Sequence, residues 1–188
     1  MAGRIVERGE RVVLRRLSAG DGEEFVHRAR ASRALHRPWA SPPTTAAGFE
    51  EYLRRARRAD TRMFLVCRAG EGDITGVVTI SQIFLGNFRS AYLGYYAFEP
   101  FAGRGYMREG LRLVMRHAFG TMGLHRLEAN VQPGNVASIR LVEGLGFRRE
   151  GFSERYLKIG GRWRDHLRFA IVAEDFFAQE SARRAEPH

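Results

Sequence analysis

The stretch that decides the fold is FAGRGYMREGLRLVMRHAF, residues 101–119. Its second half repeats apolar residues at helical spacing, which predicts an amphipathic helix with one buried face. Its first half places Gly103 and Gly105 on either side of Arg104, directly before that helix. Glycines let backbone N–H groups crowd around one point, and a helix start adds unpaired donors and partial positive charge. The loop therefore predicts a binding site for phosphate groups.

Strand and helix patterns continue on both sides of this stretch. Before it, the chain predicts a strand at 11–17, helices at 22–32 and 44–59, and strands at 63–69, 74–84 and 91–98. After it come a strand at 125–131, a short helix at 135–146 and a hairpin of strands 147–159 and 162–173. Because a helix connects strands 91–98 and 125–131, these two should run parallel inside an otherwise antiparallel sheet.

The parallel pair points to a class of ligand. If the two strands splay apart at their C-terminal ends, a flexible ligand can lie between them as a pseudo-strand, its amides pairing with free backbone groups. Its phosphates would then reach the glycine loop. Such a ligand needs amide groups and a pyrophosphate, and coenzyme A has both, whereas a nucleotide alone does not.

Composition narrows the remaining possibilities. The 188 residues, 44% of them hydrophobic, fit one domain, and no apolar run is long enough to cross a membrane. The polar N-terminus resembles no secretory signal, so we expect a cytoplasmic protein. The single cysteine, Cys67, excludes an internal disulfide and lies in an apolar run typical of a buried residue. The histidines form no pair at metal-ligand spacing, so no metal is expected.

The net charge of +10 raises the question of a polyanionic partner. Arginines gather in the N-terminal third, at positions 28–37 and 54–62. Nearly all the positive charge is arginine throughout the chain, however, and arginines on a helix usually form a solvated face. The sequence has no aromatic-interleaved basic motif and no zinc-finger spacing, so we expect no specific nucleic-acid site.

Two long segments carry a family resemblance. YLGYYAFEPFAGRGYMREGLRLVMRHAF (92–119) and LHRLEANVQPGNVASIRLVEGLGFRREGF (124–152) resemble the acetyl-CoA-binding core of the GNAT family of N-acetyltransferases. Within that family, LHRPWA (35–40) and EGFSERYLKIGGRWRDH (150–166) resemble the RimJ/RimL-type ribosomal-protein alanine N-acetyltransferases. The resemblance covers nearly the whole chain.

The resemblance implies a fold and a domain organisation. The expected fold is α+β: a central mixed, mostly antiparallel sheet of about seven strands flanked by helices, with a splayed parallel pair holding the cofactor. A single acetyltransferase domain is expected over residues 1–178, and residues 179–188 are expected to be a disordered tail.

The resemblance also implies acetyl-CoA as cofactor and assigns residues to it. Ala97 and Phe98 would pair with the pantetheine through their backbones, and Asn135 and Ser138 would contact the cofactor from the next helix. The pyrophosphate would be wrapped by Gly103, Arg104, Gly105, Tyr106 and Met107. For Asn135 a plain helix N-cap is the alternative interpretation, and both roles are compatible.

Two positions depart from the family's phosphate signature, which is usually written with Gln or Arg, two residues, Gly, one residue, then Gly or Ala. Ala102 stands at the first of these positions and Met107 at the last, whereas Gly105 matches. The missing side chain at Ala102 matters little if backbone N–H groups bind the phosphates. Met107 fits if its side chain points into the core from the apolar face of the helix.

The catalytic residues usual in the family are absent. A glutamate five residues before the cofactor Asn often serves as base, but that position is Asn130, which could instead hold a water. A tyrosine seven residues after that Asn often protonates the thiolate, but that position is Val142. Ser138 resembles the acid proposed in RimL-like enzymes and is the expected proton donor. The alternative is a serine bonding locally to the backbone.

The absence of a clear base favours an acceptor amine that is already partly neutral at physiological pH. At pH 7 roughly 10 to 15% of an α-amino group is neutral, against about 0.04% of a lysine side chain. The expected reaction is therefore acetyl transfer to the α-amino group of a protein N-terminus beginning with Ala or Ser, on a ribosomal protein. Glu128 and Glu154 are candidate proton acceptors, with ordinary strand carboxylates as the alternative.

Trp39 and three residues of the final hairpin are candidates for substrate contacts. Trp39 in the Pro-Trp loop would cover the peptide, or pack on the sheet. Tyr156, Trp163 and Asp165 on the final hairpin could receive the peptide terminus, with Asp165 pairing with its ammonium; an exposed strand charge is the alternative.

Two other functions stay open at this point. The same core could acetylate a small amine or antibiotic, although acidic residues are scarce around positions 33–45. It could also bind coenzyme A as a sensor or ribosome-assembly factor without efficient turnover. The basic N-terminal third could assist approach to the ribosome, and the sequence leaves monomer and homodimer equally open.

Overall fold

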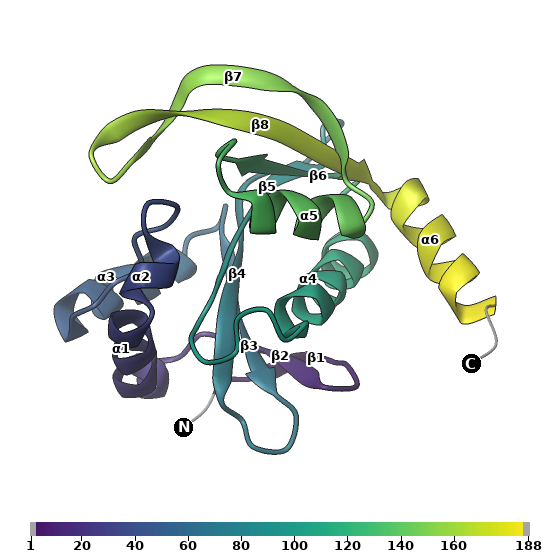
Figure 1. Ribbon diagram of the computed structural model, residues 1–188. Coiled ribbons are helices and arrows are strands. Elements are labelled where there is room, and N and C mark those ends of the chain that lie inside the picture. The colour runs from purple at the N-terminus through teal and green to yellow at the C-terminus, as the bar shows by residue number, and fades with distance from the viewer. Residues whose placement is uncertain (1–2, 186–188) are drawn as a thin grey trace.

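The computed structural model describes residues 3–185 (Figure 1). Its elements are β1 (Ile5–Arg8), β2 (Val12–Arg16), α1 (Gly22–Ala31), α2 (Arg33–His36), α3 (Ala46–Ala56), β3 (Arg62–Arg68), β4 (Ile74–Phe84), β5 (Ser90–Ala97), α4 (Tyr106–Arg116), β6 (Arg126–Val131), α5 (Val136–Gly144), β7 (Arg148–Ile159), β8 (Arg162–Val172) and α6 (Ala173–Ala185). A 3₁₀ turn at Ala19–Asp21 precedes α1, and a π-helical turn at His117–Thr121 follows α4.

A single eight-stranded sheet organises these elements, in the order β1-β2-β3-β4-β5-β6-β8-β7. All neighbouring strands are antiparallel except β5 and β6, which are parallel. The predicted mixed, mostly antiparallel sheet with one parallel pair is therefore confirmed. The strand beyond the expected seven is β1, whose four residues are too few and too exposed to give a recognisable alternation.

Helices cover both faces of the sheet. Helices α1 to α3 lie against one face, and α4 and α5 lie against the other (Figure 1). The alternation along β3 builds both cores, because Phe64 and Val66 face α4 whereas Leu65 and Cys67 face α1 and α3. Burial raises the pKa of the Cys67 thiol to about 11, which fits the predicted buried hydrophobe.

Helix α4 has the apolar face that the sequence predicts. Its buried side chains include Met107, Leu111, Val114 and Met115. A Cβ added at Gly110 would lie 2.6 Å from the side chain of Val66, so glycine at this position lets the helix approach β3 closely. The close packing holds α4 against β3.

The C-terminal segment differs from its prediction. Residues 179–185, expected in a disordered tail, form the end of α6, and residues 186–188 lie outside the described residues. Glu180 is 8% exposed and accepts hydrogen bonds from Arg112 at 2.6 Å and Arg116 at 3.1 Å, both on α4. These ion pairs pull the Glu180 pKa below its usual range against the opposing effect of burial. Local sequence patterns do not predict this helical segment, because the arginines that pair with Glu180 lie more than sixty positions away.

The parallel strands separate after a short contact. β5 and β6 are paired only from Ser90 with Arg126 to Tyr92 with Glu128. Beyond that point β5 stays with β4 as far as Ala97, and β6 stays with β8 as far as Val131. A gap therefore opens in the middle of the sheet, at the C-terminal ends of both parallel strands, as the sequence predicts.

Candidate active site

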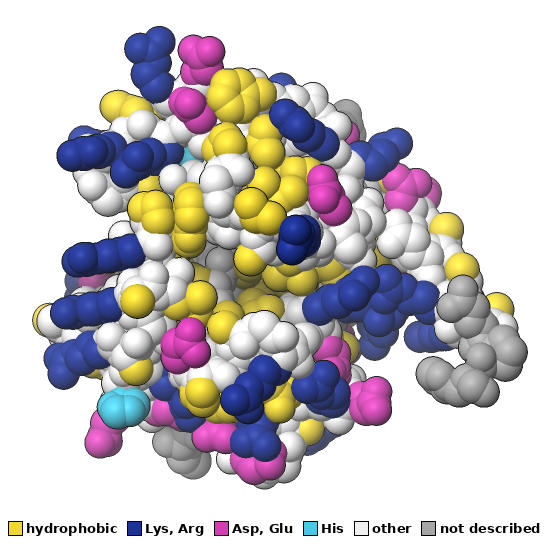
Figure 2. Space-filling view, in the orientation of Figure 1, with side chains coloured by type: hydrophobic (Ala, Val, Ile, Leu, Met, Phe, Trp, Pro, Cys, Tyr) yellow, Lys and Arg dark blue, Asp and Glu magenta, His cyan; other side chains and the backbone are white. Residues whose placement is uncertain are grey.

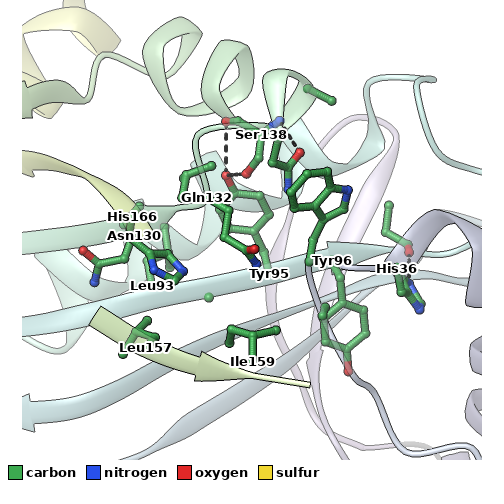
Figure 3. Close-up of a pocket in the computed structure, with 18 of the residues that line it drawn as sticks. His36, Leu93, Tyr95, Tyr96, Asn130, Gln132, Ser138, Leu157, Ile159 and His166 are labelled. Atoms are coloured by element: carbon green, nitrogen blue, oxygen red, sulfur yellow. Dashed lines mark hydrogen bonds between the residues drawn. The ribbon is translucent and has the colours of Figure 1, made fainter. Parts of the chain in front are cut away.

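The gap between β5 and β6 contains a cavity of about 530 Å³. Its walls come from both strands, from the loop after α2, from the first turn of α5 and from the β7–β8 hairpin that arches over it (Figures 1 and 3). From outside, Figure 2 shows a depression lined by hydrophobic side chains between that hairpin and the helices below it. The cavity passes between the two faces of the sheet.

Backbone groups at the end of β5 are divided between the sheet and the gap. Phe98 donates its N–H to the Thr75 carbonyl at 2.8 Å, and its own carbonyl accepts from Phe101 N–H at 2.9 Å. Because backbone groups alternate in direction along a strand, Tyr95 and Ala97 direct theirs away from β4. The Ala97 carbonyl accepts a hydrogen bond from His36 Nε2 at 2.7 Å, so its N–H is the group left for a ligand. Phe98 is therefore not placed to pair with a ligand, contrary to the prediction, and Tyr95 is the second residue with outward-facing groups beside Ala97.

A groove of about 390 Å³ continues the cavity toward the glycine loop and is lined by Gly103, Gly105, Arg108 and Arg140, among others. Gly103 and Gly105 have φ angles of +75° and +83°, a region that favours glycine. Gly105 is the N-cap of α4, and no side chain caps the first N–H groups of the helix. Free N–H donors, a helix start and two flanking guanidinium groups together fit a bound pyrophosphate.

Packing explains one of the two departures from the family signature, at Met107. Met107 is 9% exposed, and a Cβ added at Gly76 would lie 2.3 Å from its sulfur atom. Its side chain thus fills the core beneath β4, as expected. Ala102 lines the groove with no polar side chain of its own, which leaves phosphate binding to the backbone and the arginines.

On the α5 side of the gap, two hydroxyl groups form a pair. The Tyr95 Oη atom lies 2.5 Å from Ser138 Oγ and also donates to the Ser138 carbonyl at 3.3 Å (Figure 3). Burial raises the pKa of Tyr95 to about 12, so its hydroxyl stays protonated at physiological pH. The sequence analysis missed Tyr95, although the alternation of β5 places it on the same face as Leu93 and toward α5.

Asn135 has the cap role considered from the sequence. Its Oδ1 atom accepts the Ser138 N–H at 3.2 Å at the start of α5. The side-chain NH2 group has no hydrogen bond among the described residues, so it remains available to a ligand in the cavity that Asn135 lines. Val142, at the position of the usual tyrosine acid, is fully buried in the core.

The opposite face of the gap carries a different set of polar groups. Asn130 lines the cavity, and its Oδ1 atom is buried with no hydrogen-bond partner among the described residues. It also lines an adjoining pocket of about 230 Å³ with Tyr92 and Tyr156, whose hydroxyls are 3.5 Å apart. A buried amide oxygen without a partner costs free energy unless a ligand or water donates to it.

The predicted substrate residues separate into two places. Trp39, Trp163 and Asp165 line a groove of about 250 Å³ at the rim of the gap, and Trp39 also reaches the main cavity. Asp165 is partly used within the hairpin, because its Oδ1 atom accepts the Arg155 N–H at 2.7 Å. Tyr156 lies apart from them, in the pocket that it shares with Asn130.

Carboxylates are absent from the main cavity. None of the described residues that line it is Asp or Glu, and Arg55 contributes a positive charge. Glu128 is held by Arg126 at 2.9 Å, and Glu154 is exposed on β7. Neither glutamate is therefore placed as a proton acceptor in the cavity.

Two further absences apply to residues 3–185. The described helices include none with the length and apolar character needed to span a membrane. The described His, Cys, Asp and Glu side chains form no group of three or more that could hold a metal ion.

Comparison with known proteins identifies the class that this fold and site define. Residues 11–148 match the acetyltransferase (GNAT) domain, so the chain belongs to the GNAT acetyltransferase family. It is accordingly an N-acetyltransferase that uses acetyl-CoA, in agreement with the resemblance noted from the sequence.

Particular relatives carry more specific names. The chain is 37% identical over 125 residues to the probable N-acetyltransferase YjcK of Bacillus subtilis, covering 66% of this chain and 69% of that protein. It is 39% identical to the ribosomal protein uS5 alanine N-acetyltransferase of Escherichia coli, over 56% of this chain and 55% of the relative. Its structure is similar to Mycobacterium smegmatis RimJ bound to CoA-disulfide, with a TM-score of 0.81, 30% identity and coverage of 93% and 90%.

Replacing Asn135 with aspartate should separate the two roles of this residue. The carboxylate keeps an oxygen to accept the Ser138 N–H, so the melting temperature should change by no more than about 2 °C. The lost NH2 group and the added negative charge should weaken acetyl-CoA binding about tenfold. Calorimetric titration measures the affinity and differential scanning calorimetry the stability. Unchanged affinity would leave Asn135 with the cap role alone.

Proposed function

We propose that this protein transfers the acetyl group of acetyl-CoA to the α-amino group of a protein N-terminus that begins with Ala or Ser, on a ribosomal protein. The observation that carries the proposal is the absence of carboxylates among the described residues that line the main cavity. A polyamine carries several positive charges, and recognition of it calls for acidic groups. A peptide terminus presents a single amine, which must lose its proton before it can react.

The absence of carboxylates from the cavity lining supports that loss of a proton. An ammonium group that enters a poorly hydrated site without a carboxylate partner has its pKa lowered. An α-amino group starts near 7.7 to 8.0 and needs only a small shift, whereas a lysine side chain starts near 10.4. The buried Asn130 Oδ1 atom supplies an acceptor that can orient an amine N–H without holding it as an ion pair.

The chain's residues then divide between two tasks. When bound, acetyl-CoA supplies an acetyl group activated as a thioester. The glycine loop and α4 hold the phosphates. The outward-facing backbone groups of Tyr95 and the N–H of Ala97 pair with the pantetheine amides, because the Ala97 carbonyl already accepts a hydrogen bond from His36. The hydroxyls of Tyr95 and Ser138 provide protons on the α5 side of the gap, where the thiol leaves.

The relatives and the surface support a ribosomal target. A relative at 39% identity is named for alanine acetylation of ribosomal protein uS5. Figure 2 shows basic side chains gathered along one flank of the depression. The exposed arginines on and after α1, α2 and α3 are Arg30, Arg33, Arg37, Arg54, Arg55, Arg57 and Arg58. A basic flank favours approach to a ribosome in the cytoplasm, because rRNA is a polyanion.

The test is release of free thiol from acetyl-CoA with three acceptors. These are peptides beginning with Ala or Ser, the same peptides blocked at the N-terminus but carrying a lysine, and spermidine. We expect kcat/KM for the free Ala or Ser peptides to exceed the other two by about 100-fold or more, in line with the difference in neutral amine at pH 7. Turnover only with lysine or spermidine would replace this proposal with side-chain or small-amine acetylation.

Polyamine acetylation is the second candidate, because a relative at 25% identity over 160 residues is the spermidine N(1)-acetyltransferase of Escherichia coli. Tight binding of acetyl-CoA without turnover of any acceptor would instead indicate a coenzyme A sensor.

A further inference from the structure

His166 is a polar group in the main cavity to which the functions above assign no role. It lies on β8, is 3% exposed, and lines the cavity between β5 and β6. Its Nδ1 atom is 2.9 Å from the Arg164 carbonyl oxygen. No described residue forms a hydrogen bond with its Nε2 atom.

That single bond determines the tautomer. A carbonyl oxygen can only accept, so Nδ1 must carry the hydrogen. In the neutral ring Nε2 then has a free lone pair. A buried imidazole held in this way presents one basic nitrogen in a fixed orientation.

The strand register places His166 with Asn130. On β6 and β8, Asn130 pairs with Arg168 and Val131 with Leu167, so His166 lies diagonally across from Asn130 on the same face. Figure 3 shows the two side chains close together at one end of the cavity. Tyr95 and Ser138 lie at the α5 side of the same cavity. The gap thus has proton donors on one side and a lone pair on the other.

We propose that the Nε2 atom of His166 is the proton acceptor for the amine that is acetylated. The proposal rests on the proposed function in one respect, that the acceptor is an amine entering from the Asn130 side. Asn130 Oδ1 accepts one amine hydrogen and orients the nitrogen, and His166 removes the proton. His166 would therefore be a catalytic residue that replaces the glutamate missing at position 130.

The step balances without a further reagent. The amine nitrogen forms a bond to the acetyl carbon while the bond from that carbon to sulfur breaks, and the electron pair of the broken bond goes to sulfur. Before the new bond forms, the bound ammonium gives one proton to His166 Nε2. The nitrogen loses its second proton to water as the bond forms, and the sulfur takes one from the Tyr95 and Ser138 hydroxyl pair. Water restores the protonation of both groups after each turnover.

The surroundings keep the imidazole neutral. Burial lowers the pKa of His166, opposed by its bond to the Arg164 carbonyl and by the charge of Asp165. The other titratable or charged side chains that line the cavity are Tyr95, Tyr96, His36 and Arg55. Tyr156 on β7 is in edge contact with the ring, and Arg164 and Arg168 lie on the same face of β8. None of these is a carboxylate that would hold the imidazolium form.

The test is the pH dependence of kcat/KM for an Ala-terminated peptide in His166→Asn. Asparagine can still donate to the Arg164 carbonyl from the Nδ1 position but has no nitrogen at the Nε2 position. The wild type should reach its plateau with an apparent pKa below 6.5, whereas the variant should follow the amine itself, near 7.7 to 8.0. The variant should therefore be about sevenfold to tenfold slower at pH 7 and within about twofold of wild type above pH 9.

Each outcome decides the proposal. A loss of equal size at every pH would assign His166 a structural role and overturn it, as would wild-type activity at pH 7. His166→Gln serves if the asparagine variant does not fold, and His125→Gln, on an exposed histidine paired with Glu174, is the matched control. If the wild type acetylates no peptide N-terminus, the proposed function fails by itself. The profile of the variant with the amine that does react then tests His166 separately.

A second readout is independent of turnover. Nitrogen NMR of the imidazole rings, with the His166 signals assigned by their loss in His166→Asn, should show the Nδ1–H tautomer and a pKa below 6.5 in the protein without acetyl-CoA. An Nε2–H tautomer would leave no lone pair facing the cavity and would also overturn the proposal.

Discussion

Valine in place of Gly105 should weaken acetyl-CoA binding by a factor of about 100 or more, the loss expected when two or three charge-assisted hydrogen bonds are removed. Gly105 has a φ of +83° at the N-cap of α4. A β-branched residue is strained in that region, so the loop must change shape or lose backbone N–H groups from the groove. Isothermal titration with acetyl-CoA measures the effect.

The matched control is Gly72→Val. Gly72 has nearly the same φ, +82°, but is exposed in the turn before β4 with nothing within 4 Å of an added Cβ. Both variants should lose about 1–2 kcal/mol of stability from the left-handed backbone. Only the Gly105 variant should lose affinity. Full affinity in a folded Gly105→Val protein would refute the assignment of the glycine loop to phosphate.

Removal of the Ser138 hydroxyl should lower kcat about 100-fold while acetyl-CoA affinity stays within about threefold of wild type, because a positioned proton donor acts on the reaction rather than on binding. Tyr95→Phe should give a similar loss, since its hydroxyl lies 2.5 Å from Ser138 Oγ. The double variant should be little slower than either single one, because the two hydroxyls act as a unit.

The pH dependence adds a second check. The pKa of Tyr95 is raised to about 12, so the pair stays protonated from pH 6 to 10 and the loss should be constant over that range. Ser181→Ala, on an exposed helix serine, is the control. Equal losses in kcat and in acetyl-CoA affinity would mean that Ser138 supports binding, and no loss in either would leave it a structural residue.

Local patterns were sufficient to predict the glycine loop, α4 and the gap between β5 and β6, where we propose that acetyl-CoA binds. The glycines before α4, the apolar face of that helix and the crossover from β5 to β6 are all encoded within a few residues of where they act. The Thr45 cap of α3 is equally local, with its hydroxyl accepting the Gly48 N–H at 3.1 Å. Such features can be predicted because their physical cause lies within one or two turns of chain.

The remaining parts depend on distant partners. Phe98 was expected to face the ligand, but its N–H pairs with Thr75, more than twenty positions away, and nothing local indicates which strand edge a residue presents. Tyr95 was missed because its partner Ser138 lies on another element. His166 was part of a quoted motif, yet its role depends on Arg164 fixing the ring and on β6 lying beside β8. The register of paired strands and the tautomer of a histidine depend on contacts between distant parts of the chain.

The arching β7–β8 hairpin has a consequence for how this enzyme can diversify. The region that matches the family domain ends at residue 148, where β7 begins, and the groove lined by the glycine loop lies within it. Tyr156, Trp163, Asp165 and His166 all lie beyond that boundary, on a single hairpin. Under the roles proposed for these residues, mutation or recombination confined to this hairpin would change how the amine is bound and deprotonated while leaving the glycine loop and α4 intact. Recognition of the acceptor could then evolve separately from recognition of acetyl-CoA.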